Sequence, residues 1–369
     1  MHSKYSDGSG TVPEIVDAAR EAGRDAVLLS DHDSLGAKRD GWEGWYDGVL
    51  LLVGNEVSAR RAHFLTFDVD REINHYRVPE DEIPAAVQAA GGFSFAAHPF
   101  PHPSRLSKRI TLPHPSTRLV DPALCGVELW NFVSDSVARW RHPLAAIRFL
   151  RDPDAATRHP PATHMKAWDR LSAARRTVAI GGIDAHQPGI RLRGRVRTPM
   201  PNRRWFGLLG THVLLDGAPA GELERDRELV YAALRAGRCY ISRDSLADPR
   251  GFEFWAESGG GTHAAGGRTA RGERLEMGAE APAGDWTLRV RVPRKAELRL
   301  LRDGEKVAST EADDLEHRAD GPGVYRLEAH LEARSVGRTW ILSNPIHLRP
   351  SMQPRSSDRS YRSRNEIAW

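Results

Sequence analysis

Histidine, aspartate and glutamate residues in the first half of the chain recur beside short apolar runs. The candidates for chemistry are His2, Asp7, His32, Glu56, His63, His98, Asp184 and His186. Imidazole nitrogens and carboxylate oxygens are the ligands that Zn, Mn and Fe(II) take in proteins. A lone histidine is weak support for a metal site, but a set of this size at strand ends predicts a site for several divalent metal ions.

The elements that must position these groups are short strands alternating with helices. The strands expected from apolar runs are 26–29, 49–53, 63–67, 93–97, 126–131 and 178–183, and helices are expected at 13–22 and 79–90. Such alternation is typical of a parallel α/β assembly. Functional groups at the carboxyl ends of the strands favour a β/α barrel with its site on that face.

The pattern changes to alternating polarity after about residue 250. Trp286, Leu288 and Val290 alternate with polar residues, and Asp303-Gly304 is a hairpin-turn pair. We therefore predict a barrel domain at 1–248 and a small β-sandwich-like domain at 249–350. Residues 351–369 are basic and poor in apolar residues, which predicts a disordered tail.

Composition bounds the class of protein. The 369 residues carry a net charge of +4 and two cysteines without metal-site spacing. No apolar run reaches the roughly 20 residues that span a bilayer, so we expect no membrane association and a cytoplasmic location. The mild basicity favours a small anionic partner without excluding nucleic acid, and it leaves the oligomeric state unknown.

Two polar segments are candidates for contacting a substrate. A proline-containing stretch with six arginines between Arg191 and Arg204 is expected to be a loop, either solvated or attracting anions to the metal site. His102 and Arg105 lie in a proline-rich segment after His98 and could clamp a phosphate. Asn131, at a strand end, is either structural or a substrate contact.

The motif order HSKYSDG, SDHD, GNE, AHF, AHPF and GIDAH resembles the PHP superfamily, named for polymerase and histidinol phosphatase, over roughly the first 190 residues. The segment Trp340–Ile346 and the β-rich region before it resemble the branch that includes carbaryl hydrolases. The resemblance implies an irregular seven-stranded β/α barrel. It also implies that the first strand is largely missing here, because the first His of the family's HxH pair would fall before Met1.

The resemblance further implies how two or three Zn, Mn or Fe ions would be held. Asp184, His2 and Glu56 would hold one ion, Glu56, His63 and His98 a second, and Asp7, His32 and His186 a third. Glu56, Asp184 and His186 would be the catalytic residues of a phosphoesterase that uses a metal-bridging hydroxide. Asp31 and Asp33 are expected to orient neighbouring groups, since carboxylates often fix ligating imidazoles.

Three functions remain open at this point. The first is phosphate-ester hydrolysis. The second is hydrolysis of carboxylic or carbamate esters, which needs the same metal chemistry with a more apolar pocket, and the third is a non-catalytic PHP structural module. A start site upstream of Met1 would restore the missing His and would leave export open. If the chain is authentic as written, the ion bound by His2 and Asp184 lacks a ligand.

Overall fold

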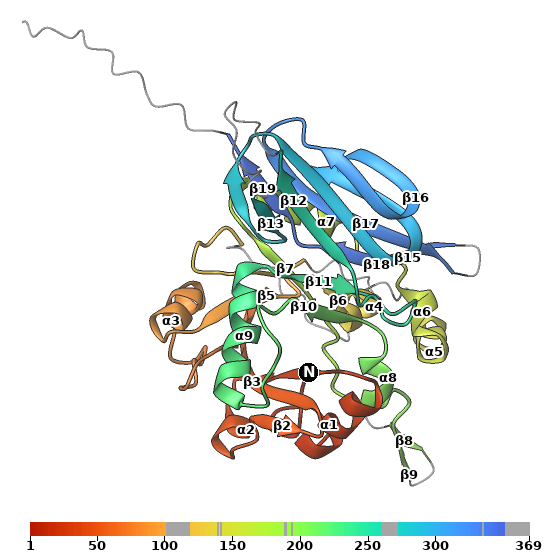
Figure 1. Cartoon of the computed structure of the whole chain (residues 1–369). Coiled ribbons are helices and arrows are strands. Elements are labelled where there is room, and N and C mark those ends of the chain that lie inside the picture. The colour runs from red at the N-terminus through yellow and green to blue at the C-terminus, as the bar shows by residue number, and fades with distance from the viewer. Residues whose placement is uncertain are drawn as a thin grey trace, which may run out of the picture.

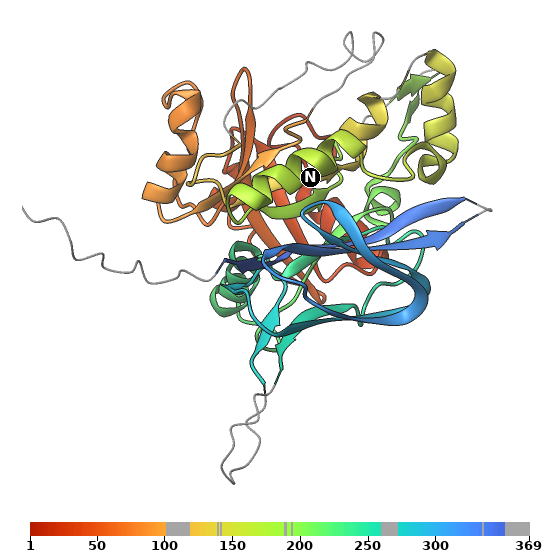
Figure 2. The ribbon, with the colours of Figure 1, turned by 90° about the horizontal axis from the view of Figure 1, so that it is seen from above.

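The computed structural model describes residues 1–100, 119–138, 140, 142–187, 190–192, 195–259, 272–333 and 336–350. This part of the chain contains two large β-sheets, with helices on the first, and a further sheet of two strands (Figure 1). The second sheet lies against one end of the first, and Figure 2 shows the two from above.

The first sheet has seven strands in the order β1-β3-β4-β5-β6-β7, with β2 paired to β3. The strands are β1 (Ala26–His32), β2 (Gly44–Tyr46), β3 (Val49–Ser58), β4 (His63–Phe67), β5 (Phe93–Ala97), β6 (Gly126–Asn131) and β7 (Val178–Gly182). The sheet curls into part of a barrel, and β1 and β7 are its two edges. Between these edges runs the N-terminal segment, where Ser30 N donates to Met1 O (3.0 Å) and His2 N donates to Ala185 O (3.1 Å).

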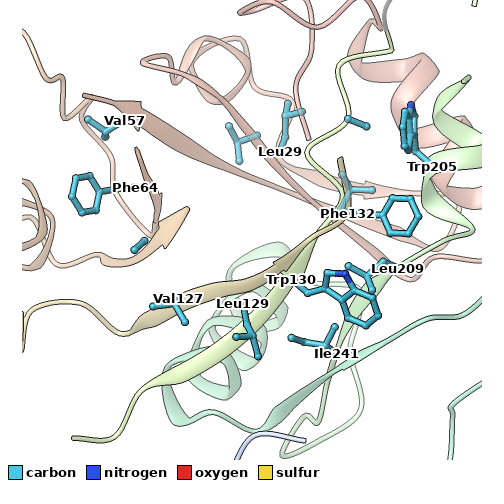
Figure 3. Close-up of a cluster of buried hydrophobic side chains, with 14 of the residues drawn as sticks. Leu29, Val57, Phe64, Val127, Leu129, Trp130, Phe132, Trp205, Leu209 and Ile241 are labelled. Carbon is cyan, nitrogen blue, oxygen red and sulfur yellow. The ribbon is translucent and has the colours of Figure 1, made fainter. Parts of the chain in front are cut away.

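Alternation along β3 divides the residues between the two faces of this sheet. Val49, Leu51 and Val53 belong to the larger core, which the outer helices cover. Figure 3 shows part of this core, with Leu29, Val57, Phe64, Val127, Leu129, Trp130, Phe132, Trp205, Leu209 and Ile241 labelled. Leu50 and Leu52 point to the other face, into a second core that helix α9 covers. Glu56 and Ser58 continue this second face beyond its apolar part.

The helices are α1 (Val12–Glu21), α2 (Gly36–Arg39), η1 (Glu80–Glu82), α3 (Ile83–Ala89), α4 (Phe132–Ala138), α5 (Pro143–Arg151), α6 (Pro153–Ala156), α7 (Ala162–Ala174), α8 (Asn202–Phe206) and α9 (Leu223–Ala236). Helix α1 begins as its sequence predicts. Thr11 and Glu14 form a reciprocal capping box, and Pro13 lies in the first turn.

The second sheet has ten strands, and every pair in it is antiparallel except β14 with β19. Its strands are β10 (Gly210–Val213), β11 (Cys239–Ser242), β12 (Glu253–Ser258), β13 (Arg274–Glu276), β14 (Glu280–Pro282), β15 (Trp286–Arg302), β16 (Glu305–Arg318), β17 (Gly323–Glu332), β18 (Gly337–Ser343) and β19 (Ile346–Arg349). Asp303 and Gly304 make the predicted turn between β15 and β16, with φ of 53° and 88°. The predicted fold class, a mixed α/β barrel-like sheet followed by an all-β region, is confirmed.

Asn344 joins the two sheets with one buried side chain. Its Oδ1 accepts from Ala179 N of β7 (2.7 Å), and its Nδ2 donates to Ala179 O (2.9 Å) and Cys239 O (2.8 Å). β10 and β11 also contact both sheets. They belong to the second sheet by their hydrogen bonds, and they pack on β7 of the first. The domain boundary at residue 248 stays a prediction.

One expectation is corrected by the structure, and others lie outside the described residues. The arginine-containing stretch is not simply a loop: β8 (Ile190–Leu192) and β9 (Arg195–Arg197) pair as a hairpin, and α8 follows. Strand pairing satisfies the backbone groups of this polar stretch, which side-chain polarity alone did not reveal. His102, Arg105 and the predicted disordered tail 351–369 lie outside the described residues. No helix in the described ranges is both long enough and apolar enough to cross a membrane.

Candidate metal centre

The register of the first sheet brings the candidate ligands to one end of its strands. β1 and β3 are parallel, and His32 lies opposite Glu56 at this end. β4 runs antiparallel to β3, so its first residue, His63, lies at the same end of the sheet, opposite Ser58. His98 follows β5 directly, and Asp184 lies two residues beyond β7. Strand direction and pleat alone therefore collect residues that are far apart in sequence.

The most buried cluster consists of His2, Glu56 and Asp184. His2 Nε2 lies 3.1 Å from Asp184 Oδ1 and 3.3 Å from Glu56 Oε2. The side chains of His2 and Glu56 are 1% and 3% exposed. This is the first of the three predicted ligand sets, and its potential ligand atoms lie within 4.8 Å of one another.

Glu56 also faces the second predicted set through its other oxygen. Glu56 Oε1 lies 2.7 Å from His63 Nδ1 and 3.3 Å from His98 Nε2. The cluster with compact ligand geometry, however, combines Glu56 and His63 with His32, whose Nδ1 lies 3.9 Å from Glu56 Oε1. Glu56 therefore sits between two groups of potential ligands, one on each carboxylate oxygen.

The third cluster surrounds Asp7 and includes His2 in addition to the predicted residues. Asp7 Oδ1 lies 3.3 Å from His186 Nε2, 3.8 Å from His32 Nε2 and 4.0 Å from His2 Nδ1. The His2 ring stacks on those of His32 and His186, with centroid distances of 4.3 and 4.1 Å. Asp7 is 61% exposed, so this cluster is the one that opens to solvent.

The donor set fits divalent metal ions. An ion with bonds of about 2.0–2.2 Å holds neighbouring ligand atoms roughly 3–3.5 Å apart, close to the separations around His2 and Asp7. His2 Nδ1 is buried and has no hydrogen-bond partner among the described residues. A buried polar nitrogen without a partner is costly, and binding an ion would remove that cost.

The groups also shift one another's pKa values. Burial opposes the charged form of His2, but the hydrogen bonds to Asp184 and Glu56 outweigh burial and raise the pKa of His2 to about 9. Burial acts likewise on His98, whose pKa the Glu56 carboxylate raises to about 10. Burial alone would raise the pKa values of the Glu56 and Asp184 carboxylates. The neighbouring imidazoles outweigh burial and hold both pKa values well below the ordinary range. For His32, burial dominates and lowers the pKa.

Two candidate ligands have strained backbones. His98 has a φ of 29° and Asp184 a φ of 55°, values that non-glycine residues rarely adopt. Each conformation costs about 1–3 kcal/mol and is typical of functional sites. In both cases the chain has just left a strand and must turn sharply, which directs the side chain to the cluster.

The two carboxylates beside His32 contact neighbouring segments. Asp31 accepts hydrogen bonds from Ser3 N, Ser3 Oγ and Ser6 Oγ, each at 2.7 Å, and so anchors the segment that carries His2 and Asp7. Asp33 Oδ1 lies 3.0 Å from His75 Nδ1 and accepts from Ser58 N at 3.3 Å.

Glu128 and Asn131 form the wall of the cluster next to β7. Glu128 Oε2 accepts from His98 N (2.9 Å) and from Asn131 Nδ2 (3.0 Å). Burial raises the pKa of Glu128. These contacts show a structural function for both residues, in positioning His98, and the substrate contact predicted for Asn131 stays a prediction. Both residues also line a cavity of about 190 Å³, together with Glu56, Asp184 and apolar side chains including Phe95 and Ile180.

Gly182 is adjacent to Glu128, and we expect Gly182→Ala to destabilise the protein. A Cβ at this position would lie 2.0 Å from Glu128 Oε1, so the carboxylate would have to shift and would strain the bonds of its Oε2 to His98 N and Asn131. Overpacking of this kind lowers the free energy of unfolding by about 1–3 kcal/mol. Urea denaturation would measure the loss. Gly217→Ala is the control, since a Cβ there meets nothing within 4 Å, and equal losses in the two variants would contradict this account.

Two serine residues at the centre were missed from the sequence. Ser58 Oγ lies 2.6 Å from His32 Nδ1, and Ser134 Oγ donates to Asp184 Oδ2 at 3.3 Å. Ser58 follows Glu56 by two positions on β3, and this period is the sequence signal that places both on one face of the strand. The sequence carries no comparable signal for Ser134.

Comparisons with known proteins give low similarities. No protein-family model and no curated protein sequence matches the chain. A solved structure from Bacteroides vulgatus, a two-domain protein containing a predicted PHP-like metal-dependent phosphoesterase, is 16% identical with a TM-score of 0.38 over 93% of each chain. A Bifidobacterium adolescentis protein proposed to be a metal-dependent phosphoesterase is 17% identical with a TM-score of 0.31, over 53% of this chain and 87% of that one. At such values, what can be said of this centre rests on its own geometry.

Proposed function

We propose that the chain is a metal-dependent hydrolase of the PHP type that cleaves a phosphate ester, with residues 1–248 as its catalytic part. The observation that carries the proposal is the convergence of His2, Glu56 and Asp184 beside the Asp7 cluster. Both clusters share His2, and Glu56 links the first to His63. Two or three Zn, Mn or Fe ions held there would supply Lewis acidity and a water of lowered pKa.

The chain's own residues have distinct functions in this proposal. Glu56 presents one oxygen to each of two ligand groups and holds them at a fixed separation. Asp184 would ligate an ion and orient the attacking oxygen, and Ser134 Oγ donates to its second carboxylate oxygen. When no ion engages its Nε2, His186 is the candidate proton donor to the leaving group, because its side chain is 28% exposed and lies beside the open Asp7.

An anionic phosphate suits this centre because several divalent cations would attract and bind it. Hydrolysis of a carboxylic or carbamate ester is the second candidate, and the apolar lining of the cavity beneath Glu56 and Asp184 favours it. A structural module without activity is the third. It has no need of a buried histidine nitrogen without a partner, which counts against it.

Metal analysis and paired substrates would test the proposal. We would measure metal content by elemental analysis and turnover of an aryl phosphate and an aryl ester by the same protein. Two or three metals per chain and phosphate turnover that Asp184→Ala abolishes are expected. Asp17→Ala, at a carboxylate 64% exposed on α1, is the matched control. Turnover of the ester alone would favour the second candidate function. A metal-free, inactive protein would refute both proposed hydrolytic activities.

A further inference from the structure

His32 can be drawn into either of two metal clusters. Through Nε2 it faces Asp7 (3.8 Å), and through Nδ1 it faces Glu56 Oε1 (3.9 Å). The geometry of potential ligand atoms accordingly includes His32 in the cluster of Asp7 and His186 and also in that of Glu56 and His63. A neutral imidazole has one ring nitrogen with a lone pair available for a metal, so its tautomer decides between the two.

The hydrogen bonds of Ser58 decide this tautomer. Ser58 Oγ donates to the carbonyl oxygen of Glu56 at 3.1 Å, and a carbonyl can only accept. A hydroxyl has a single proton, so its 2.6 Å contact with His32 Nδ1 requires the ring nitrogen to be the donor. In this arrangement the proton of His32 lies on Nδ1, and the lone pair on Nε2 points towards Asp7.

The backbone around Ser58 holds this arrangement. Asp33 N donates to Glu56 O (3.0 Å), and Ser58 N donates to Asp33 Oδ1 (3.3 Å), so the ends of β1 and β3 are tied together where His32 and Ser58 lie. His186 is fixed in a comparable way, because its Nδ1 lies 3.0 Å from the carbonyl oxygen of Asp184. In both imidazoles the lone pair of Nε2 is then directed towards the side of the cluster where Asp7 lies.

We propose that Ser58 is a positioning residue that commits His32 to the Asp7–His186 cluster and keeps it out of the Glu56–His63 cluster. The consequence for metal binding rests on the function proposed above, whereas the tautomer of His32 does not. Hydrogen-bonded partners of metal ligands contribute about 10–100-fold to metal affinity. We expect loss of the Ser58 hydroxyl to weaken one class of metal site by that factor and to leave the others unchanged.

The first experiment uses metal-free full-length protein labelled with ¹⁵N-histidine, above the pKa of His32. Long-range ¹H–¹⁵N correlation spectra distinguish a protonated ring nitrogen from one with a lone pair, and His32→Gln identifies the His32 signals by their loss. We expect Nδ1 to be protonated in the wild type and the preference to disappear in Ser58→Ala. A proton on Nε2 in the wild type would overturn the proposal, whether or not the protein binds metal.

The second experiment is calorimetric titration of the metal-free protein with Zn²⁺. Ser58→Ala should weaken one class of sites about 10–100-fold, and Ser58→Thr should restore it because threonine keeps the hydroxyl. Ser34→Ala is the control, since Ser34 Oγ accepts from Gly36 N (3.1 Å) in the loop after His32. Wild-type affinity in Ser58→Ala, at every site, would overturn the proposal. Absence of Zn²⁺ binding by the wild type would instead refute the proposed function and leave the tautomer to the spectra.

Discussion

Replacement of Glu56 by glutamine should remove bound metal and lower turnover by at least about 1,000-fold. Glutamine keeps the size of the side chain but loses the charge that faces His2, His63 and His98. Lewis-acid stabilisation supplies several kcal/mol to such reactions, and about 4 kcal/mol corresponds to a factor of 1,000. Elemental analysis and turnover of an aryl phosphate at saturating metal would measure both effects.

The control for this prediction is Glu72→Gln. Glu72 accepts from Leu35 N (2.9 Å) near the same edge of the sheet but lies outside the three clusters. The Glu72→Gln protein should keep its metal and its activity. A Glu56→Gln protein with wild-type metal content would show that Glu56 is not a ligand, even if its activity were lost.

Metal affinity should rise steeply with pH. The pKa of His2 is about 9 and that of His98 about 10, so both rings carry a proton at pH 7 that an ion must displace. Release of one to two protons increases the apparent affinity about 10–100-fold per pH unit, until the pH approaches 9. Titrations between pH 6.5 and 8.5, in buffers of different ionisation enthalpy, would count the protons.

The metal-free protein should show the opposite trend at alkaline pH. The raised pKa values of His2 and His98 stabilise the fold below their ordinary value of 6.5, and this stability is lost as the pH rises through 9 and 10. The lowered pKa values of Glu56 and Asp184 stabilise it above their ordinary values of 4.5 and 3.8, and this is lost on acidification. The urea midpoint should therefore be higher near pH 6 than at pH 9.5. A midpoint that climbs between these values would contradict the ion pairing within the cluster.

Much of the first sheet could be predicted because its signals are local. Apolar runs ended at residues such as His32 and Glu56, and the period of two in β3 assigns Leu50, Leu52 and Glu56 to one face. Parallel strands then require these ends to meet. The predicted ligands came together for that reason, although which oxygen or nitrogen faces which partner depends on rotamers that no sequence pattern specifies.

The parts that could not be predicted depend on pairing between distant segments. β10 and β11 fall within the segment 1–248 predicted as the barrel domain, but their hydrogen bonds go to one another and to β18. Ser134 reaches Asp184 from the start of α4, across a sequence separation of 50 residues. The hairpin of β8 and β9 was hidden because each strand is only three residues long and the register pairs arginine with Ile190, Val196 and Leu192.

The contacts of Asn344 tie the stability of the candidate centre to the second sheet. Its amide holds both backbone groups of Ala179 in β7, the strand that leads to Asp184, and also reaches Cys239. Removing residues 249–350 would leave these groups of Ala179 without partners, at a cost of about 1–3 kcal/mol for each group. Heating should therefore unfold the two sheets in one cooperative transition, because the C-terminal strands support the strand that leads to the candidate centre.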